Sequence, residues 1–187
     1  MKIFGIDPGS MRTGYGCVES DGAGFRLVTC GAIAAPSGSS FPEKLHVIHD
    51  TLLRVIRETA PDCVSVENLF HSRNVRSALQ LGHARGVALL AAVIAGVPIV
   101  EYTPAEIKLA VVGYGRADKT QVQHMVKLLL GLDTVPVPYD ASDALAAALC
   151  HGHSGTSALA NRANRALPRH LRNWRDYRPA AAVRQAP

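Results

Sequence analysis

The fold is decided by Ile3-Phe4-Gly5-Ile6-Asp7-Pro8-Gly9-Ser10-Met11-Arg12-Thr13-Gly14-Tyr15-Gly16. Here an apolar strand delivers Asp7 to a tight Pro-Gly turn, and a second, Gly-rich strand follows. A carboxylate in this position leaves the end of a buried strand, where it can meet a metal ion or a phosphate. Taken alone the pattern is more typical of a simple turn, because Asp bonds to its own backbone and Pro presets φ. Other parts of the sequence are needed to distinguish a simple turn from a metal or phosphate site.

Apolar patterning around this stretch predicts a mixed α/β fold. Strands at 15–20 and 25–34, joined by the Asp21-Gly22 turn, should form an antiparallel meander with the first strand. Periodicity and capping signals predict helices near 41–59, 74–96, 103–112, 119–130 and 140–151. Strands at 63–67 and 97–102 flank the second helix, so they should be parallel. The expected mixed five-stranded sheet with helices on both faces resembles the ribonuclease H-like fold.

The 187 residues suit one domain, expected at 1–153, with an Arg-rich and flexible tail at 154–187. Seven arginines and a single acid, Asp176, lie beyond residue 150, so the formal net charge of +5 is a property of this tail. Its charge favours a nucleic-acid or acidic partner equally with a role as a solubilising appendage.

Several classes of protein are disfavoured by composition. No uninterrupted apolar run approaches about 18 residues, so no membrane span is expected. The chain opens directly on a strand, without a secretory signal, and its four cysteines are widely spaced, which together predict a cytoplasmic protein with reduced thiols. Cys150, His151 and His153 lack a second pair of ligands, which argues against a zinc site.

Three further acids accompany Asp7. Glu67 ends the fourth expected strand, so both acids would leave the sheet at one edge if these strands are neighbours. Asp140 and Asp143 lie three residues apart at a helix start and share one face. Capping is the alternative for this pair, since Asp is a strong capping residue. The apolar segment 144–149 nevertheless predicts a deeply packed helix with its acidic end against the sheet.

Four carboxylates without basic partners would repel one another, so such a cluster predicts bound cations. Ligands that offer only oxygen select Mg²⁺ or Mn²⁺ over zinc. A pair of such ions can activate water and stabilise the leaving 3′ oxygen of a phosphodiester.

Short motifs are spread in order over residues 2–152: Ile6-Asp7-Pro8-Gly9, Thr13-Gly14-Tyr15-Gly16, Glu67-Asn68-Leu69-Phe70, His83-Ala84-Arg85-Gly86, Val111-Val112-Gly113-Tyr114-Gly115, Lys119-Thr120-Gln121-Val122-Gln123 and Asp140-Ala141-Ser142-Asp143-Ala144-Leu145-Ala146. In this combination and spacing they resemble the RuvC-type Holliday junction resolvases of bacteria. The resemblance implies an endonuclease that nicks a four-way DNA junction symmetrically, leaving 5′-phosphate and 3′-hydroxyl ends. It implies Asp7, Glu67, Asp140 and Asp143 as catalytic and metal-binding acids, with two Mg²⁺ per site that Mn²⁺ can replace.

The resemblance also implies DNA contacts. Phe70 matches a stacking residue next to the junction centre, and this role is favoured over the alternative of a loop residue packed on the core, because a Phe three residues after a catalytic Glu can meet unstacked bases. Lys108 and Lys119 match basic positions near the cleaved phosphate. Further phosphate contacts are expected from side-chain chemistry alone, with a solvated helix face as the alternative, at Arg73, Arg76, Arg85 and Arg116. His124 is a candidate for a supporting role.

Two partners are implied besides the junction. Small residues at Ala78, Gly82 and Gly86 form a stripe on the helix that makes the homodimer contact in the family; packing on its own sheet is the alternative. The family also associates with the RuvA–RuvB branch-migration complex.

Three other functions fit the sequence less well. An actin-like or Hsp70-like ATPase would need a second Gly-rich phosphate loop in a second half of the chain. A related nuclease of ribosomal RNA precursors fits the segments 67–70 and 119–123 less well. A non-catalytic junction-binding protein would not need the complete acid set.

Overall fold

A five-stranded sheet forms the centre of the molecule. Its strands are β1 (Lys2–Asp7), β2 (Thr13–Ser20), β3 (Phe25–Ile33), β4 (Cys63–Glu67) and β5 (Ile99–Tyr102). They lie in the order β3-β2-β1-β4-β5. Antiparallel pairing joins β1, β2 and β3, whereas β4 is parallel to both β1 and β5. The predicted meander and the predicted parallel pair are therefore confirmed, and β1 and β4 are neighbours.

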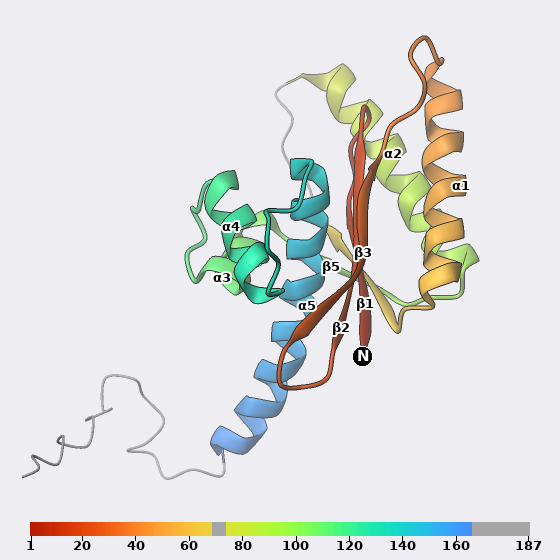
Figure 1. The fold of residues 1–187 in the computed structure, drawn as a ribbon. Helices are drawn as coiled ribbons and strands as arrows, with labels where there is room; N and C mark the ends of the chain where they lie inside the picture. Colours follow the sequence, from red (N-terminus) through yellow and green to blue (C-terminus); the bar gives the residue numbers. More distant parts are fainter. Residues whose placement is uncertain (69–73, 166–187) are drawn as a thin grey trace, which may run out of the picture. The chain divides into compact units, whose positions relative to one another are not determined.

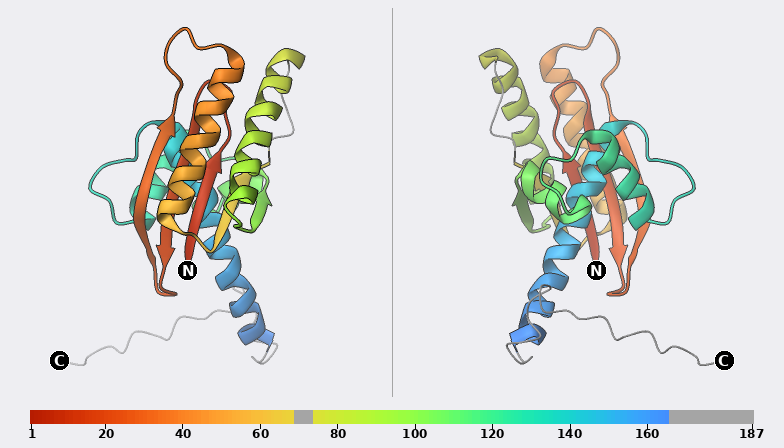
Figure 2. Two further views of the ribbon diagram at one scale, coloured as in Figure 1. Left: turned by 90° about the vertical axis from the view of Figure 1, so that its right-hand side faces the viewer. Right: turned by 90° about the vertical axis from the view of Figure 1, so that its left-hand side faces the viewer.

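Helices cover both faces of this sheet, as expected. They are α1 (Phe41–Thr59), α2 (Val75–Ile94), α3 (Pro104–Val112), α4 (Lys119–Leu129) and α5 (Tyr139–Arg165). In Figure 1 the sheet is seen on edge, with α1 and α2 on one side and α3, α4 and α5 on the other. Figure 2 shows the same division, with α1 and α2 in front of the strands in one view and α3 to α5 in front in the opposite view. The structure, a computed structural model, describes residues 1–68 and 74–165, with side chains described as far as Ser154.

Each face of the sheet has its own apolar core, because alternate residues of a strand point to opposite faces. Phe4, Ile6 and Val66 pack with α1 and α2 in one cluster. Ile3 packs with the apolar side of α5 in the other. Asp7 continues the Ile3-Gly5 side of β1, so its carboxylate lies on the α5 face.

Close approach of α5 to the sheet depends on glycines. A Cβ added to Gly5 would lie 1.8 Å from the carbonyl oxygen of Ala144, and one on Gly14 would lie 1.9 Å from that of Asp140. The Ser65 hydroxyl also donates to the carbonyl of Ala147 at 2.7 Å. Backbone therefore packs on backbone, which fixes the first turn of α5 beside β1 and β2.

α5 differs from its prediction at both ends. It begins at Tyr139, so Asp140 lies inside the first turn and is not the capping residue. It continues to Arg165, whereas the sequence suggested an end near 151. Gly152 lies within this helix, and a Cβ there would lie 2.2 Å from Phe25. This glycine provides room for β3 against the helix and does not end it.

Candidate active site

Asp7 and Glu67 lie side by side at the carboxyl ends of two parallel strands. The register pairs Ile6 with Val66, so the next residue of each strand faces α5 at the same edge. This arrangement confirms the condition on which the sequence argument depended. Both carboxylates are only partly exposed.

The first turn of α5 brings the other two acids to this edge. Asp143 lines a cavity of about 300 Å³ together with Asp7 and Glu67. The remaining lining residues are Pro104, Ile107, Lys108, Lys119, Val122 and Ala146. Asp140 lines a separate hollow on the other side, with Arg12. Three of the four predicted acids therefore share one cavity, and Asp140 borders it.

Two cations accompany these acids: Lys119, which the resemblance implied near the cleaved phosphate, and Arg12, which was not among the predicted site residues. Lys119 Nζ lies 3.1 Å from Asp143 Oδ2. Arg12 Nη1 lies 3.8 Å from Asp140 Oδ2. The expectation of a cluster without basic partners is therefore wrong. Arg12 was missed as a site residue, although its place in the loop directly after Asp7 was a usable signal.

Burial and like charge make Asp7 hard to ionise. Desolvation first, and then the charges of Glu67, Asp143 and Asp140, raise the pKa of Asp7 from 3.8 to about 8, against the opposing charge of Lys119. Burial and Asp143 also raise the pKa of Glu67. Burial alone would lower the pKa of Lys119, but its ion pair with Asp143 raises it above the usual value. The partly buried carboxylates repel one another, and a bound cation would offset this repulsion.

The donor chemistry fits Mg²⁺ or Mn²⁺. Asp7, Glu67 and Asp143 offer only carboxylate oxygens to the cavity, the ligands that these hard cations prefer. Across residues 1–68 and 74–154, no three His, Cys, Asp or Glu side chains are gathered closely enough to hold one ion. Asp140 and Asp143 are each paired with a cation. Small side-chain rotations toward Asp7 would be needed to form a complete set of ligands.

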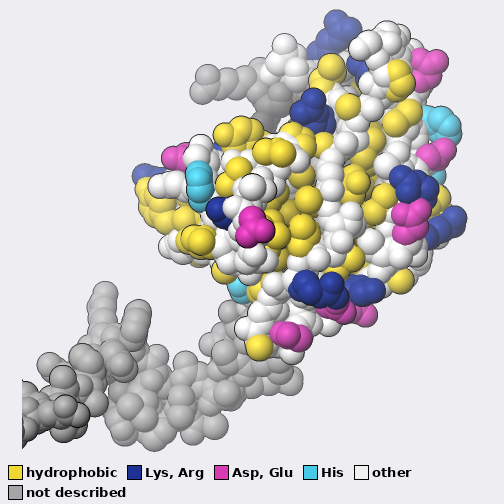
Figure 3. Space-filling model, viewed as in Figure 1, with side chains coloured by type: hydrophobic (Ala, Val, Ile, Leu, Met, Phe, Trp, Pro, Cys, Tyr) yellow, Lys and Arg dark blue, Asp and Glu magenta, His cyan; other side chains and the backbone are white. Residues whose placement is uncertain are grey.

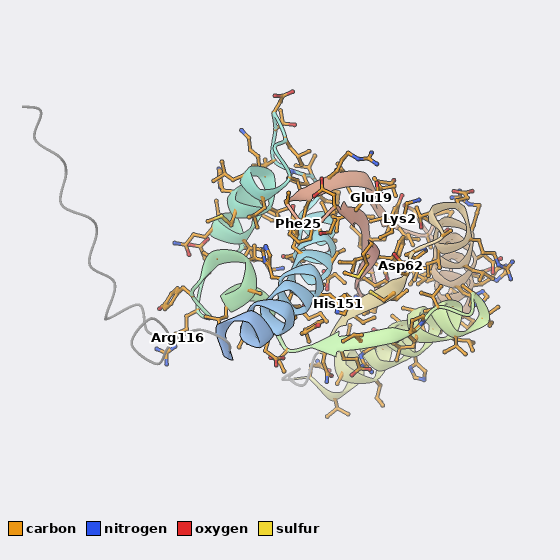
Figure 4. All side chains as sticks on the ribbon, turned by 90° about the horizontal axis from the view of Figure 1, so that it is seen from below. Lys2, Glu19, Phe25, Asp62, Arg116 and His151 are labelled. Carbon is orange, nitrogen blue, oxygen red and sulfur yellow. The ribbon has the colours of Figure 1, made fainter. Side chains whose placement is uncertain are left out.

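The predicted DNA contacts fall into three groups. Lys108 and Lys119 line the acidic cavity. Arg76 is exposed in the first turn of α2, and Arg116 is exposed between α3 and α4, at the periphery of the molecule in Figure 4. The predictions for Phe70 and Arg73 lie outside the described residues.

Other residues singled out in the sequence have partners away from the cavity. Arg85 Nη2 lies 2.7 Å from Glu101 Oε1, so the structure gives it an ion pair within the protein. His124 is exposed and its Nδ1 lies 2.8 Å from the carbonyl oxygen of Thr120. His151, seen from below in Figure 4, bonds through Nδ1 to the hydroxyl of Tyr102 at 2.8 Å. None of the three lines the acidic cavity.

Stability of the metal-free protein should fall as the pH rises from 4 to 8. Between these values folded Asp7 binds a proton that the unfolded chain has lost, so the free energy of unfolding decreases with pH. The slope is at most about 1.4 kcal/mol per pH unit for one group. Urea denaturation in EDTA should therefore show Asp7→Asn as more stable than wild type at pH 8 and nearly equal at pH 4.5. Equal stability of the two proteins at pH 8 would show that Asp7 ionises normally.

Comparisons with known proteins cover the whole unit that carries these acids. The family model described as crossover junction endodeoxyribonuclease RuvC matches residues 3–151. A curated protein of that name from Trichlorobacter lovleyi is 50% identical over 179 residues, which cover 96% of this chain and 100% of the relative. RuvC of Thermus thermophilus is 37% identical, with a TM-score of 0.76 over 84% of this chain and 97% of the other. T. thermophilus RuvC in complex with a Holliday junction substrate is 36% identical, with a TM-score of 0.80 over 84% and 96% of the chains.

Proposed function

Because this chain belongs to the RuvC family of crossover junction endodeoxyribonucleases, we infer that it resolves Holliday junctions by divalent-metal-dependent hydrolysis of two phosphodiester bonds. One observation in this chain's own structure supports this inference independently of the family. Asp7, Glu67 and Asp143 converge from β1, β4 and α5 on one cavity that also holds two lysines. Rigid elements supply every one of these groups, as a site for precise phosphate chemistry requires.

Each side chain has a distinct task in this proposal. Asp7 and Glu67 provide the fixed part of the metal site, since both end strands of the central sheet. Asp140 and Asp143 complete it from the first turn of α5. Lys119 balances Asp143 in the free protein, and we propose that it contacts the DNA phosphate together with Lys108, which also lines the cavity. When bound, two Mg²⁺ ions, or Mn²⁺ in their place, would activate the attacking water and stabilise the leaving oxygen.

Symmetric cleavage requires two such sites, and α2 offers the surface for a dimer. Val75, Leu79 and Val93 are 77%, 60% and 63% exposed on its outer side. A groove in the same face is lined by Ala78, Leu79, Gly82, His83, Gly86, Val87 and Leu90. Nothing lies within 4 Å of a Cβ added to Gly82 or Gly86. The small residues are therefore not packed on their own sheet, and we propose that they admit the same helix of a second copy.

The apolar character of α2 has a second consequence. By length and composition this helix could cross a membrane, although its sequence contains no long uninterrupted apolar run, and 22% of the relevant window is buried within the chain. A helix that packs on α1 with one side and on a second copy with the other has the same composition. We propose the dimer, in a cytoplasmic protein, as the reason for it.

Disrupting this face should give a monomer. We expect Leu79→Glu to abolish dimerisation at micromolar concentration, because it would bury charge in the apolar groove, and to eliminate paired nicking of a junction. Light scattering coupled to gel filtration measures the mass directly. Leu128→Glu is the matched control, since Leu128 is 69% exposed on α4. A dimeric Leu79→Glu protein would contradict the assignment of the interface.

Cleavage products test the proposed reaction. With Mg²⁺ and a labelled four-way junction, we expect paired nicks at equivalent positions in two strands of like polarity, with 5′-phosphate ends that a ligase can seal. Binding without cleavage would favour the non-catalytic alternative. Cleavage of structured ribosomal RNA in preference to the junction would favour the RNA-processing alternative. Association with the RuvA–RuvB complex remains a proposal from the family.

A further inference from the structure

A second hollow lies beside the acidic cavity, on the far side of Asp140. Its volume is about 620 Å³. The lining residues are Met11, Arg12, Ala34, Ala35, Pro36, Ser37, Gly38, Lys44 and Asp140. They come from the loop after β1, the connection between β3 and α1, the first turns of α1 and the start of α5. We call this hollow the Arg12 groove.

The Arg12 groove adjoins the catalytic cavity directly. Asp7 pairs with Gly14 across β1 and β2, and the carbonyl of Asp140 lies where a side chain on Gly14 would be. Asp140 therefore separates the two hollows. We therefore expect a DNA strand that presents a phosphate to Asp7 to bring a flanking phosphate near this groove.

Charge in the Arg12 groove suits a phosphate. Two cations, Arg12 and Lys44, face one acid, Asp140, and Arg12 already neutralises that acid. On the face shown in Figure 3, Lys and Arg side chains are scattered and do not gather into one patch. With two cations beside one acid, this groove can provide a phosphate contact that positions a strand.

The walls of the Arg12 groove are held in place from both sides. The Thr13 hydroxyl is completely buried, donates to the carbonyl of Gly9 at 2.9 Å and so fixes the loop that carries Arg12. Lys44 lies in the second turn of α1, whose start is closed by a bond of 2.6 Å from Ser40 N to Glu43 Oε2. Lys44 Nζ reaches to 3.9 Å from the sulfur of Met11 and so spans the opening. These contacts leave the two charged groups at the surface on a rigid frame.

We propose that the Arg12 groove binds a phosphate of the cleaved DNA strand next to the scissile one, through Arg12 and Lys44. This inference rests on the proposed nuclease function and adds a positioning site to it. As the strand enters, Arg12 exchanges Asp140 for a phosphate. The Arg12–Asp140 ion pair is long and both groups are solvated. The pair is therefore weak, and a phosphate readily replaces Asp140 as the partner of Arg12. Asp140 is thereby released to turn toward Asp7. Entry of the substrate strand and completion of the carboxylate set are in this way coupled.

Junction binding in EDTA tests the proposal without cleavage. We expect Arg12→Gln and Lys44→Gln each to weaken binding of the full-length protein roughly three- to tenfold and to reduce the salt slope by about one. Arg57→Gln is the matched control, because Arg57 is exposed in the last turn of the same helix as Lys44. Thermal unfolding checks that all three variants remain folded.

A neutral methylphosphonate at single positions beside the cleavage site identifies the phosphate. At one flanking position it should weaken wild-type binding but add little to the loss in Arg12→Gln, since both changes remove the same contact. Wild-type affinity and slope in both groove variants, or fully additive losses at every flanking position, would overturn the proposal. If wild type itself neither binds nor cuts junctions, the nuclease proposal fails; if wild type cuts and the variants bind normally, only the Arg12 groove fails.

Discussion

Asp7→Asn is expected to reduce junction cleavage by at least about 1,000-fold, equivalent to about 4 kcal/mol of transition-state stabilisation. Asp7 lies between the other acids: Glu67 neighbours it on β4, and both Asp140 and Asp143 add to the charge that raises its pKa. The substitution keeps the size of the side chain but removes the negative charge that a metal ion requires. Single-turnover cleavage of a labelled junction with saturating Mg²⁺ measures the effect.

Junction binding by Asp7→Asn, in contrast to cleavage, should not be weakened. Removing a carboxylate from a site that receives a phosphate lowers repulsion, so Asp7→Asn should bind the junction at least as tightly as wild type. Asp21→Asn is the control, because Asp21 is exposed in the β2–β3 turn. Asp21 Oδ1 accepts hydrogen bonds from Ala23 N and Gly24 N, and the side-chain oxygen of Asn can accept the same bonds. Cleavage by Asp7→Asn within about threefold of wild type would show that the reaction does not depend on this acid.

Gly14→Ala should impair both stability and catalysis. Its new Cβ would lie 1.9 Å from the carbonyl oxygen of Asp140 and 2.3 Å from the carbonyl carbon, so the first turn of α5 must move. Overpacking of this kind costs about 1–3 kcal/mol of stability. A displacement of about 1 Å in a catalytic group lowers the rate by about 100-fold. Urea denaturation and single-turnover cleavage measure the two effects on the same preparation.

Gly24→Ala controls for the loss of glycine itself, since a Cβ at Gly24 would have nothing within 4 Å. Both its stability and its cleavage rate should stay close to those of wild type. A fully active Gly14→Ala protein would mean that the position of α5 against β2 does not set the geometry of the acids.

Local patterns in the sequence predicted most of the fold. Asp21-Gly22 identified the hairpin, and the capping pattern Thr103 to Glu106 identified the start of α3, where Thr103 Oγ1 accepts from Glu106 N. Asp7 and Glu67 were identified as a pair because each ends a buried strand, and the parallel pairing of β1 and β4 confirms their proximity. Period-two alternation then determines which face both side chains occupy.

Long-range contacts account for what was missed. The sequence suggested that the last helix ends near 151, but the helix continues past Gly152, which packs closely against Phe25, more than 120 residues away. Lys119 and Arg12 were not expected to pair with the acids, because each pair joins elements that only the folded chain brings together. Capping by Asp140 was a reasonable local interpretation, yet α5 begins one residue earlier. Patterns in neighbouring residues cannot predict these contacts, because the contacts depend on how α5 packs on the sheet.

Anomalous scattering from Mn²⁺ in crystals of the wild-type protein tests the central claim most directly. We predict a manganese peak in the cavity of Asp7, Glu67 and Asp143, with carboxylate oxygens at about 2.0–2.2 Å, the range for hard cations of this size. The same soak of Asp7→Asn crystals should lose that peak. Manganese bound only elsewhere, or bound equally in the Asp7→Asn protein, would contradict the assignment of these acids as the metal site.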